Sequence, residues 1–405
     1  MQLGYSLVIF LSFFWLQVSF ALEPVLERVN SRSSQSLELA IKRYVNPGAT
    51  PLLLLPGVSS NDRVWDAKIS KYSFAQQLHA HGFDVWIANY RHMGTPGFKS
   101  ESPPRPYHWT IEDYAIEDLP AIVDAVTRRT GQVPFLLGHS LSAIVFEGYF
   151  AGITRNSDGK IIRDILLSEF RQKKHPGVIT VAGVYGLWWS KSIKNFISNP
   201  VLSRDDFYQS NYELELLSRI GPLYPIVHSM DSLPLGWIGR VLSFSFDKIP
   251  FIGSKIGGYY QNFQEGILNT SLLNMLYYHP NSDPTMVRDH CLDGLEEMGP
   301  RLVEQLANAM VHRKTMSHYH ARKPPEDVYY YETIRESFNV PLMVVAGTKD
   351  RLAHHQMIYQ DGYLKTNSPD KQWIEIEAGH LDILTGKNNQ EELIEPLVDW
   401  IELRD

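Results

Sequence analysis

Short runs of apolar residues that stop at or near a glycine recur along the chain, and they constrain its fold most. The clearest of them occupy 52–55 (LLLL), 133–137 (VPFLL), 178–182 (VITVA) and 340–346 (VPLMVVA). A strand without polar alternation is buried on both of its faces, as strands are inside a parallel sheet. The runs therefore predict a mostly parallel sheet that is covered on both sides.

Helical patterns separate these runs. We expect helices over 111–129, 141–150 and 391–403, and further strands over 37–45, 83–89 and 373–377, the first of them as an edge-type strand. Strands that alternate with helices are typical of a doubly wound α/β sheet. The predicted fold class is therefore α/β, with a core divided between residues 22–185 and 336–405.

The alternation of strands and helices stops between about residues 185 and 331. This stretch is rich in aromatic side chains, with WW at 188–189, SFSF at 243–246 and GGYYQNF at 257–263. We predict that residues 186–335 form a large, mainly helical lid inserted into the core, with one helix over 294–312.

The first 21 residues have the character of a targeting segment. Residues 3–22 carry no charged side chain, and the apolar run ends in Ser19-Phe20-Ala21, with small residues at the positions that a signal peptidase prefers. We expect a secretory signal cleaved after Ala21 and a secreted or periplasmic protein. An uncleaved anchor is the alternative, because about 20 apolar residues can span a bilayer.

Composition excludes several classes of function. The 38 Lys and Arg residues against 45 Asp and Glu residues give a net charge of −7, which offers no electrostatic attraction for nucleic acid. Cys291 is the only cysteine, so an intrachain disulfide and a cysteine-based zinc site are excluded. Phosphate-binding and dinucleotide-binding glycine motifs are missing, and we expect neither a cofactor nor a metal. Asn269 begins a glycosylation triplet, which matters only in a eukaryotic host.

The strongest chemical signal is the sequence FLLGHSLS at 135–142, where a buried strand runs directly into a helix. This context is that of a nucleophile elbow, in which a sharp turn lifts a serine hydroxyl clear of the sheet. Gly138 supplies the small residue that the close strand–helix contact needs, and Ser142 replaces the usual second glycine. We predict that Ser140 is the nucleophile; an ordinary serine in a tight turn is the alternative.

A serine hydroxyl needs a base that takes its proton, and the base needs an acid that orients it. His380 follows the last expected strand and Asp350 follows the strand before it, so both lie at the carboxyl edge of the sheet, where open α/β folds bind ligands. The chain order of serine, acid and histidine fits a nucleophile elbow. Asp382 is poorly placed to reach the ring of His380, and we expect the side chain of His139 to point away from Ser140.

A developing oxyanion needs two backbone N–H donors. Leu141 follows the nucleophile directly and opens a helix, whose N-terminal amides favour negative charge. For the second donor we expect Val58, in the loop after the strand 52–55, with Gly57 allowing a close approach; no HGGG run is present.

The segments LLLLPGV, GFDVWIANYR, GHSLS, VAGTKDRLA and AGHLD together resemble the α/β-hydrolase superfamily over residues 52–183 and 338–403. Within it, the segments 82–91 and 114–119 are similar to the lipase and esterase branch that includes the acid lipases. The resemblance implies hydrolysis of carboxylic esters with lipid-like acyl groups, under a helical lid. Ser142 in place of glycine departs from the commonest pattern.

We therefore expect a serine hydrolase that cleaves lipid-like esters through Ser140, His380 and Asp350. The aromatic residues of 186–335 would form a wall for the acyl chain and a contact with a lipid surface, but they could also only pack the lid against itself. Two other hypotheses stay open: acyl transfer to an alcohol acceptor, and a catalytically silent binding protein of the same fold. The intact set of serine, acid and histidine argues against the silent protein.

Overall fold

The computed structural model describes residues 23–32, 37–102, 109–185, 276–299, 301–302, 305–306, 309 and 331–405. The targeting segment 1–21, the triplet at Asn269 and most of the expected insertion 186–335 lie outside these residues. Among the described residues, no helix has the length and apolar character that crossing a membrane requires.

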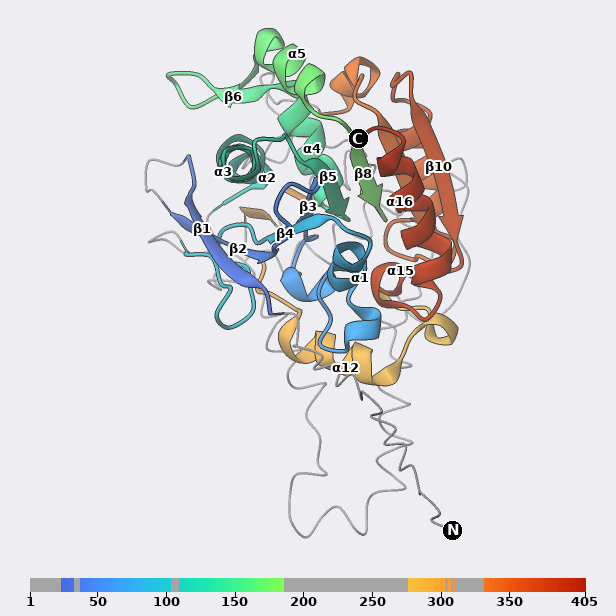
Figure 1. The fold of residues 1–405 in the computed structure, drawn as a ribbon. Coiled ribbons are helices and arrows are strands. Elements are labelled where there is room, and N and C mark those ends of the chain that lie inside the picture. The colour runs from blue at the N-terminus through green and yellow to red at the C-terminus, as the bar shows by residue number, and fades with distance from the viewer. Residues whose placement is uncertain are drawn as a thin grey trace, which may run out of the picture.

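An eight-stranded sheet forms the centre of the molecule, with the strand order β1-β2-β4-β3-β5-β8-β9-β10 (Figure 1). β1 and β2 are antiparallel to their neighbours, and the strands from β4 to β10 are mutually parallel. The strands are β1 (Val25–Asn30), β2 (Glu38–Tyr44), β3 (Pro51–Leu55), β4 (Asp84–Ala88), β5 (Phe135–His139), β8 (Val178–Val181), β9 (Leu342–Gly347) and β10 (Lys371–Ile376). The prediction of a mostly parallel sheet is confirmed.

The strand expected over 37–45 is β2, and the expectation that it lies at the edge was wrong. β1 pairs with it on the outside, with Val25 opposite Arg43. β1 carries no strong sequence signal, because its residues VLERVN mix apolar and charged side chains that stay mostly exposed. β2 lies between two strands, and most of it is therefore buried.

Helices cover both faces of the sheet (Figure 1). The helices are α1 (Phe74–Ala80), α2 (Ile111–Asp113), α3 (Leu119–Thr130), α4 (Ser142–Ala151), α5 (Ile165–Lys174), α12 (Pro284–Asp293), α14 (His355–Met357), α15 (Asp382–Thr385) and α16 (Glu395–Glu402). One π-helical turn, Tyr114–Asp118, joins α2 to α3, so the helix expected over 111–129 is confirmed. A small hairpin of β6 (Ile153–Arg155) and β7 (Ile161–Arg163) precedes α5.

Two apolar cores result from the pleat of the strands, because successive side chains point to opposite faces. Leu52 and Leu54 of β3 belong to the core that contains residues of α1 and α16, whereas Leu53 and Leu55 belong to the core of α3 and α4. All four leucines are fully buried. This double burial explains why β3 has no polar alternation.

The helix expected over 294–312 was wrong at its start. Residues 294–299 are not helical, whereas the described residues 301, 302, 305, 306 and 309 are. A separate helix, α12, precedes them; it begins after the capping residue Asp283 with a proline in its first turn and ends at a glycine. Leu295 then forms an isolated β-bridge with Ser60. The described part of the expected insertion is therefore joined to the loop after β3.

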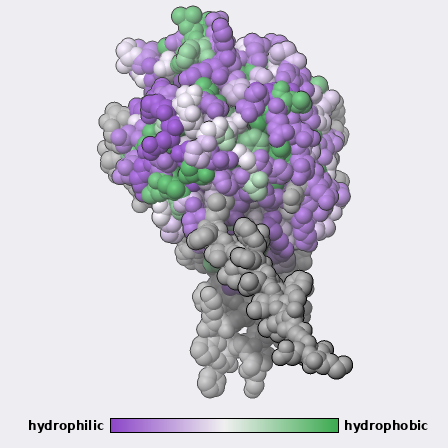
Figure 2. All heavy atoms as spheres, viewed as in Figure 1, coloured by the Kyte–Doolittle hydropathy of each residue, from purple (hydrophilic) through white to green (hydrophobic). Residues whose placement is uncertain are grey.

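The visible face of the described molecule is mostly hydrophilic, and its apolar residues form small separate patches (Figure 2). One such patch lies over α5, where Leu166 and Phe170 expose 77% and 61% of their surface.

Candidate active site

The turn between β5 and α4 places Ser140 in a strained position. Ser140 has a φ of 53°, in the left-handed region that costs energy for a residue with a side chain. Its backbone is held by β8 and by the turn that follows this strand, because its N–H donates to Val181 O at 3.0 Å and its carbonyl accepts from Val184 N at 3.1 Å. A Cβ atom added at Gly138 would lie 2.5 Å from the ring of Phe146, so this position has no room for a side chain.

The structure brings the three predicted residues Ser140, His380 and Asp350 together. His380 Nε2 lies 2.9 Å from Ser140 Oγ, and His380 Nδ1 lies 2.7 Å from Asp350 Oδ2. The three are 2%, 3% and 1% exposed. They meet because β9 and β10 are parallel neighbours whose carboxyl ends deliver Asp350 and His380 to the same edge as the turn after β5.

The two oxygens of Asp350 have different partners, which fixes the tautomer of His380. Oδ1 accepts from the backbone N–H groups of Leu352 and Ala353, each at 2.8 Å. Oδ2 is left to accept from Nδ1–H of His380, because a carboxylate can only accept. The lone pair of Nε2 then faces the hydroxyl of Ser140, which donates to it.

Asp382, the rejected alternative acid, has its oxygens turned toward backbone and amide donors. They accept from Tyr278 N at 2.8 Å, from Gly379 N at 3.0 Å and from Asn281 Nδ2 at 3.0 Å. Burial raises the pKa of its carboxyl above the usual value, while these donors oppose that rise. Asp382 thus holds the loop on which His380 sits and leaves its ring to Asp350.

The two segments that carry the predicted oxyanion donors both lie next to Ser140 in the structure. Leu141 follows Ser140 and opens α4. Gly57, next to Val58, passes so close that an added Cβ atom would lie 2.8 Å from Ser140 Cβ and 3.4 Å from its Oγ. The loop after β3 therefore runs beside the hydroxyl, as Val58 requires to serve as second donor.

Buried charges hold this loop in place. Asp62 accepts from Lys42 Nζ at 2.6 Å and from the backbone and hydroxyl of Thr95 at 2.8 Å each. Burial alone would raise the pKa of Asp62, but Lys42 and these hydrogen bonds hold it below its usual value. Glu296 accepts from Asn61 Nδ2 at 2.8 Å. The loop is thus fixed from β2, from the loop after β4 and from the described part of the insertion.

Ser142 has a contact that its motif position alone does not indicate. Its Oγ donates to Pro56 O at 2.7 Å and lies 3.1 Å from the hydroxyl of Tyr90. A glycine could make neither contact. Ser142, which replaces the usual glycine, therefore links the elbow to the end of β3. In the sequence, this replacement was the signal from which such a contact could have been anticipated.

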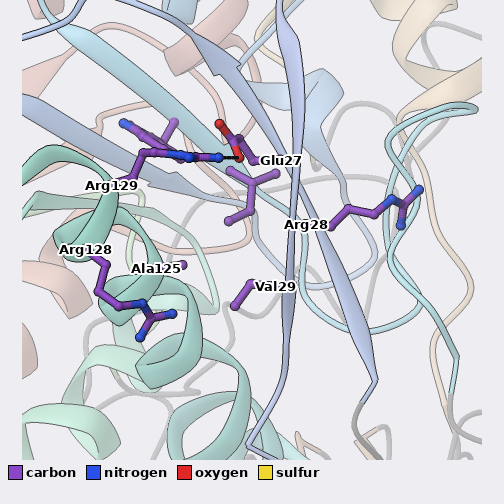
Figure 3. Close-up of a pocket in the computed structure, with 8 residues that line it drawn as sticks. Glu27, Arg28, Val29, Ala125, Arg128 and Arg129 are labelled. Atoms are coloured by element: carbon purple, nitrogen blue, oxygen red, sulfur yellow. Dashed lines mark hydrogen bonds and ion pairs between the residues drawn. The ribbon is translucent and has the colours of Figure 1, made fainter.

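Two cavities in the described part of the chain differ in their distance from this centre. One of about 330 Å³ is lined by Tyr277, Tyr278, His279, Pro280, Thr348, Lys349, Asp350, Arg351 and His354. The other, of about 240 Å³, lies beside β1 and α3 and contains the ion pair of Glu27 with Arg129 (Figure 3). Ser140 lines neither of them. No group of histidine, cysteine, aspartate or glutamate side chains among the described residues could hold a metal ion.

Comparisons with known proteins bear on the family and the fold of this chain. A family model described as "Alpha/beta hydrolase family" matches residues 52–392. Triacylglycerol lipase 1 of Arabidopsis thaliana is 29% identical over 129 residues, which are 29% of this chain and 31% of that protein. This chain thus aligns with less than a third of the length of that relative.

Solved structures share the fold at low sequence identity. The monoacylglycerol lipase of Paleococcus ferrophilus is 16% identical, with a TM-score of 0.50 over 91% of this chain and 99% of that one. The structure of DcsB in complex with its substrate analogue is 13% identical, with a TM-score of 0.51 over 94% of this chain and 100% of that one.

Proposed function

The chain belongs to the alpha/beta hydrolase family, and from this premise we propose that it is a serine hydrolase that cleaves carboxylic esters. The observation that carries the proposal is the continuous line of hydrogen bonds from Ser140 through His380 to Asp350. The curated relatives named as triacylglycerol lipases support the same reaction class.

In the proposed reaction, Ser140 Oγ attacks the carbonyl carbon of the ester while His380 Nε2 takes its proton. Asp350 keeps the ring in the right tautomer and stabilises the imidazolium that forms. The N–H groups of Leu141 and Val58 donate to the tetrahedral oxyanion. The alcohol leaves with the proton from His380, and water, activated by the same ring, then releases the acid from the acyl-serine. No cofactor takes part.

For the substrate we propose an ester with a lipid-like acyl group. The support is the aromatic density of the sequence between 186 and 263, together with the curated lipases. Burial of each methylene contributes about 0.8 kcal/mol, so four of them would contribute roughly 3 kcal/mol, or on the order of 10²-fold in specificity. The opposite expectation is a preference for acetate, with aromatic residues that only pack against one another.

One set of assays tests both parts of the proposal. The purified protein should be labelled by a fluorophosphonate and should hydrolyse p-nitrophenyl esters, and Ser140→Ala should lose on the order of 10⁶-fold in turnover with an unchanged melting temperature. Rates should rise from acetate to octanoate, and Trp188→Ala with Trp189→Ala should lower that rise. An unlabelled, inactive wild type would make the protein a silent binder, and ester formation with an added alcohol in preference to hydrolysis would make it an acyltransferase.

A further inference from the structure

We propose that His139 is a positioning residue for His380, acting through a hydrogen bond from its Nε2–H to the backbone carbonyl of His380. This inference rests on the proposed function, because it assigns a role within that reaction. The sequence expectation that the side chain of His139 points away from the serine leaves open what it does contact.

The geometry of His139 is specific. Its Nε2 lies 2.9 Å from His380 O, its ring centroid lies 4.8 Å from that of His380, and only 1% of the residue is exposed. A carbonyl oxygen can only accept, so Nε2 carries the proton and Nδ1 carries the lone pair. In the described part of the chain this Nδ1 is buried without a hydrogen-bond partner.

His139 also contacts the opposite wall of the site. A Cβ atom added at Gly57 would lie 3.0 Å from His139 Nδ1. The imidazole therefore stands between the loop that delivers His380 and the loop that carries Val58. One ring sets the spacing between the proposed base and the proposed oxyanion donors.

Such a spacer matters because His380 lies in a short loop beyond the end of β10. Asp382 holds the backbone before it, at Gly379 N, and His139 holds the carbonyl of His380 itself. Without the hydrogen bond from His139, the ring of His380 could shift relative to Ser140. A misplacement of about 1 Å costs on the order of 10²-fold in rate.

The surroundings also suit a ring that stays uncharged during the reaction. Burial, and after it the neighbouring His380, hold the pKa of His139 well below its usual value. When His380 becomes an imidazolium, the neighbouring ring of His139 therefore adds no second positive charge.

A matched pair of variants separates positioning from simple filling of space. In His139→Gln the side-chain Nε2 lies as many bonds from Cβ as the ring Nε2 does, so it can still donate to His380 O. In His139→Asn the amide is one carbon shorter and cannot reach. His139→Leu removes the donor and keeps an apolar side chain of moderate size.

We expect His139→Asn and His139→Leu to lower kcat on a p-nitrophenyl ester on the order of 10²-fold with KM within about twofold, because the change affects the reacting groups and not substrate binding. His139→Gln should recover at least tenfold of the loss. The rate of fluorophosphonate labelling of Ser140 should follow the same order.

The outcomes distinguish the two proposals. If wild type neither labels nor hydrolyses any ester, the proposed function fails. If wild type is active and His139→Asn keeps its kcat, or His139→Gln is no better than His139→Asn, the positioning role is wrong. The Gln and Asn variants are both polar and similar in volume, so their comparison holds even where His139→Leu does not fold.

Discussion

The loop after β9 contains the buried Asp350, and the loop after β10 ends at the buried Asp382, the first residue of α15; the two aspartates differ in what they hold. Asp350 and Asp382 are equally buried, at 1% exposure each, and both lie at the carboxyl edge of the sheet. Asp350 faces an imidazole nitrogen, whereas Asp382 faces backbone and amide N–H groups. Burial and residue type therefore do not distinguish the two aspartates, and it is the partner of its oxygens that makes Asp350 the proposed acid.

The difference follows from where each loop turns. In the β9 loop, Leu352 N and Ala353 N occupy one oxygen of Asp350 and leave the other free to reach across to the next loop. In the β10 loop, the chain turns back immediately after His380, so Asp382 meets the amide of its own loop at Gly379. In the proposed reaction the β9 loop thus supplies the acid, whereas Asp382 fixes the backbone of the β10 loop.

The largest expected effect lies in the β9 loop. Asp350→Asn should lower kcat by about 10⁴-fold, because an amide cannot fix the productive tautomer of His380, although the geometry is retained. Urea unfolding should show a change in stability of no more than about 1 kcal/mol. The control is Asp382→Asn assayed in parallel: a silent Asp350→Asn beside an inactive Asp382→Asn would show that the acid is misassigned.

The next-largest effect is expected in the β10 loop, as a loss of folding stability. Asp382→Ala should lower the free energy of unfolding by about 3 kcal/mol, because Gly379 N, Tyr278 N and Asn281 Nδ2 lose their acceptor and each buried donor costs about 1–3 kcal/mol when unmade. Equilibrium urea unfolding measures it, with Asp350→Ala as the matched variant. A larger loss in Asp350→Ala than in Asp382→Ala would reverse the division of roles between the loops.

The parts of this picture that the sequence predicts are those that depend on local pattern. The strand ends after 133–137, 340–346 and 373–377 and the turn at Ser140 follow from apolar runs and small residues, which is why Ser140, Asp350 and His380 could be named as candidates. Their mutual distances needed the sheet order, which brings β9 beside both β8 and β10.

What the sequence does not predict depends on contacts between distant segments. The hydrogen bond of His139 to His380 spans 241 positions and leaves no periodic signal. The bridge of Leu295 with Ser60, in a region expected to be helical, is of the same kind. β1 is missed for a different reason, since its exposed side chains have no consistent alternation.

The smallest effect is a difference in pH dependence between wild type and Asp382→Asn. Burial raises the folded-state pKa of Asp382 above that of the unfolded chain, so between those two values the native state binds more protons than the unfolded one. Stability contributed by this group therefore increases as pH falls through that window, and Asp382→Asn lacks the contribution. Buried His175, whose pKa burial lowers to about 3, destabilises both proteins in acid, so its effect cancels in the difference between them.

Urea unfolding at several pH values between 7 and 4 measures this difference. As pH falls, the free energy of unfolding of wild type should increase relative to that of Asp382→Asn. If the free energy of unfolding of wild type instead decreases relative to that of Asp382→Asn, the effect of the three donors on the pKa outweighs that of burial. The carboxylate is then the stabilised form, and a charged aspartate holds the β10 loop as one holds the β9 loop.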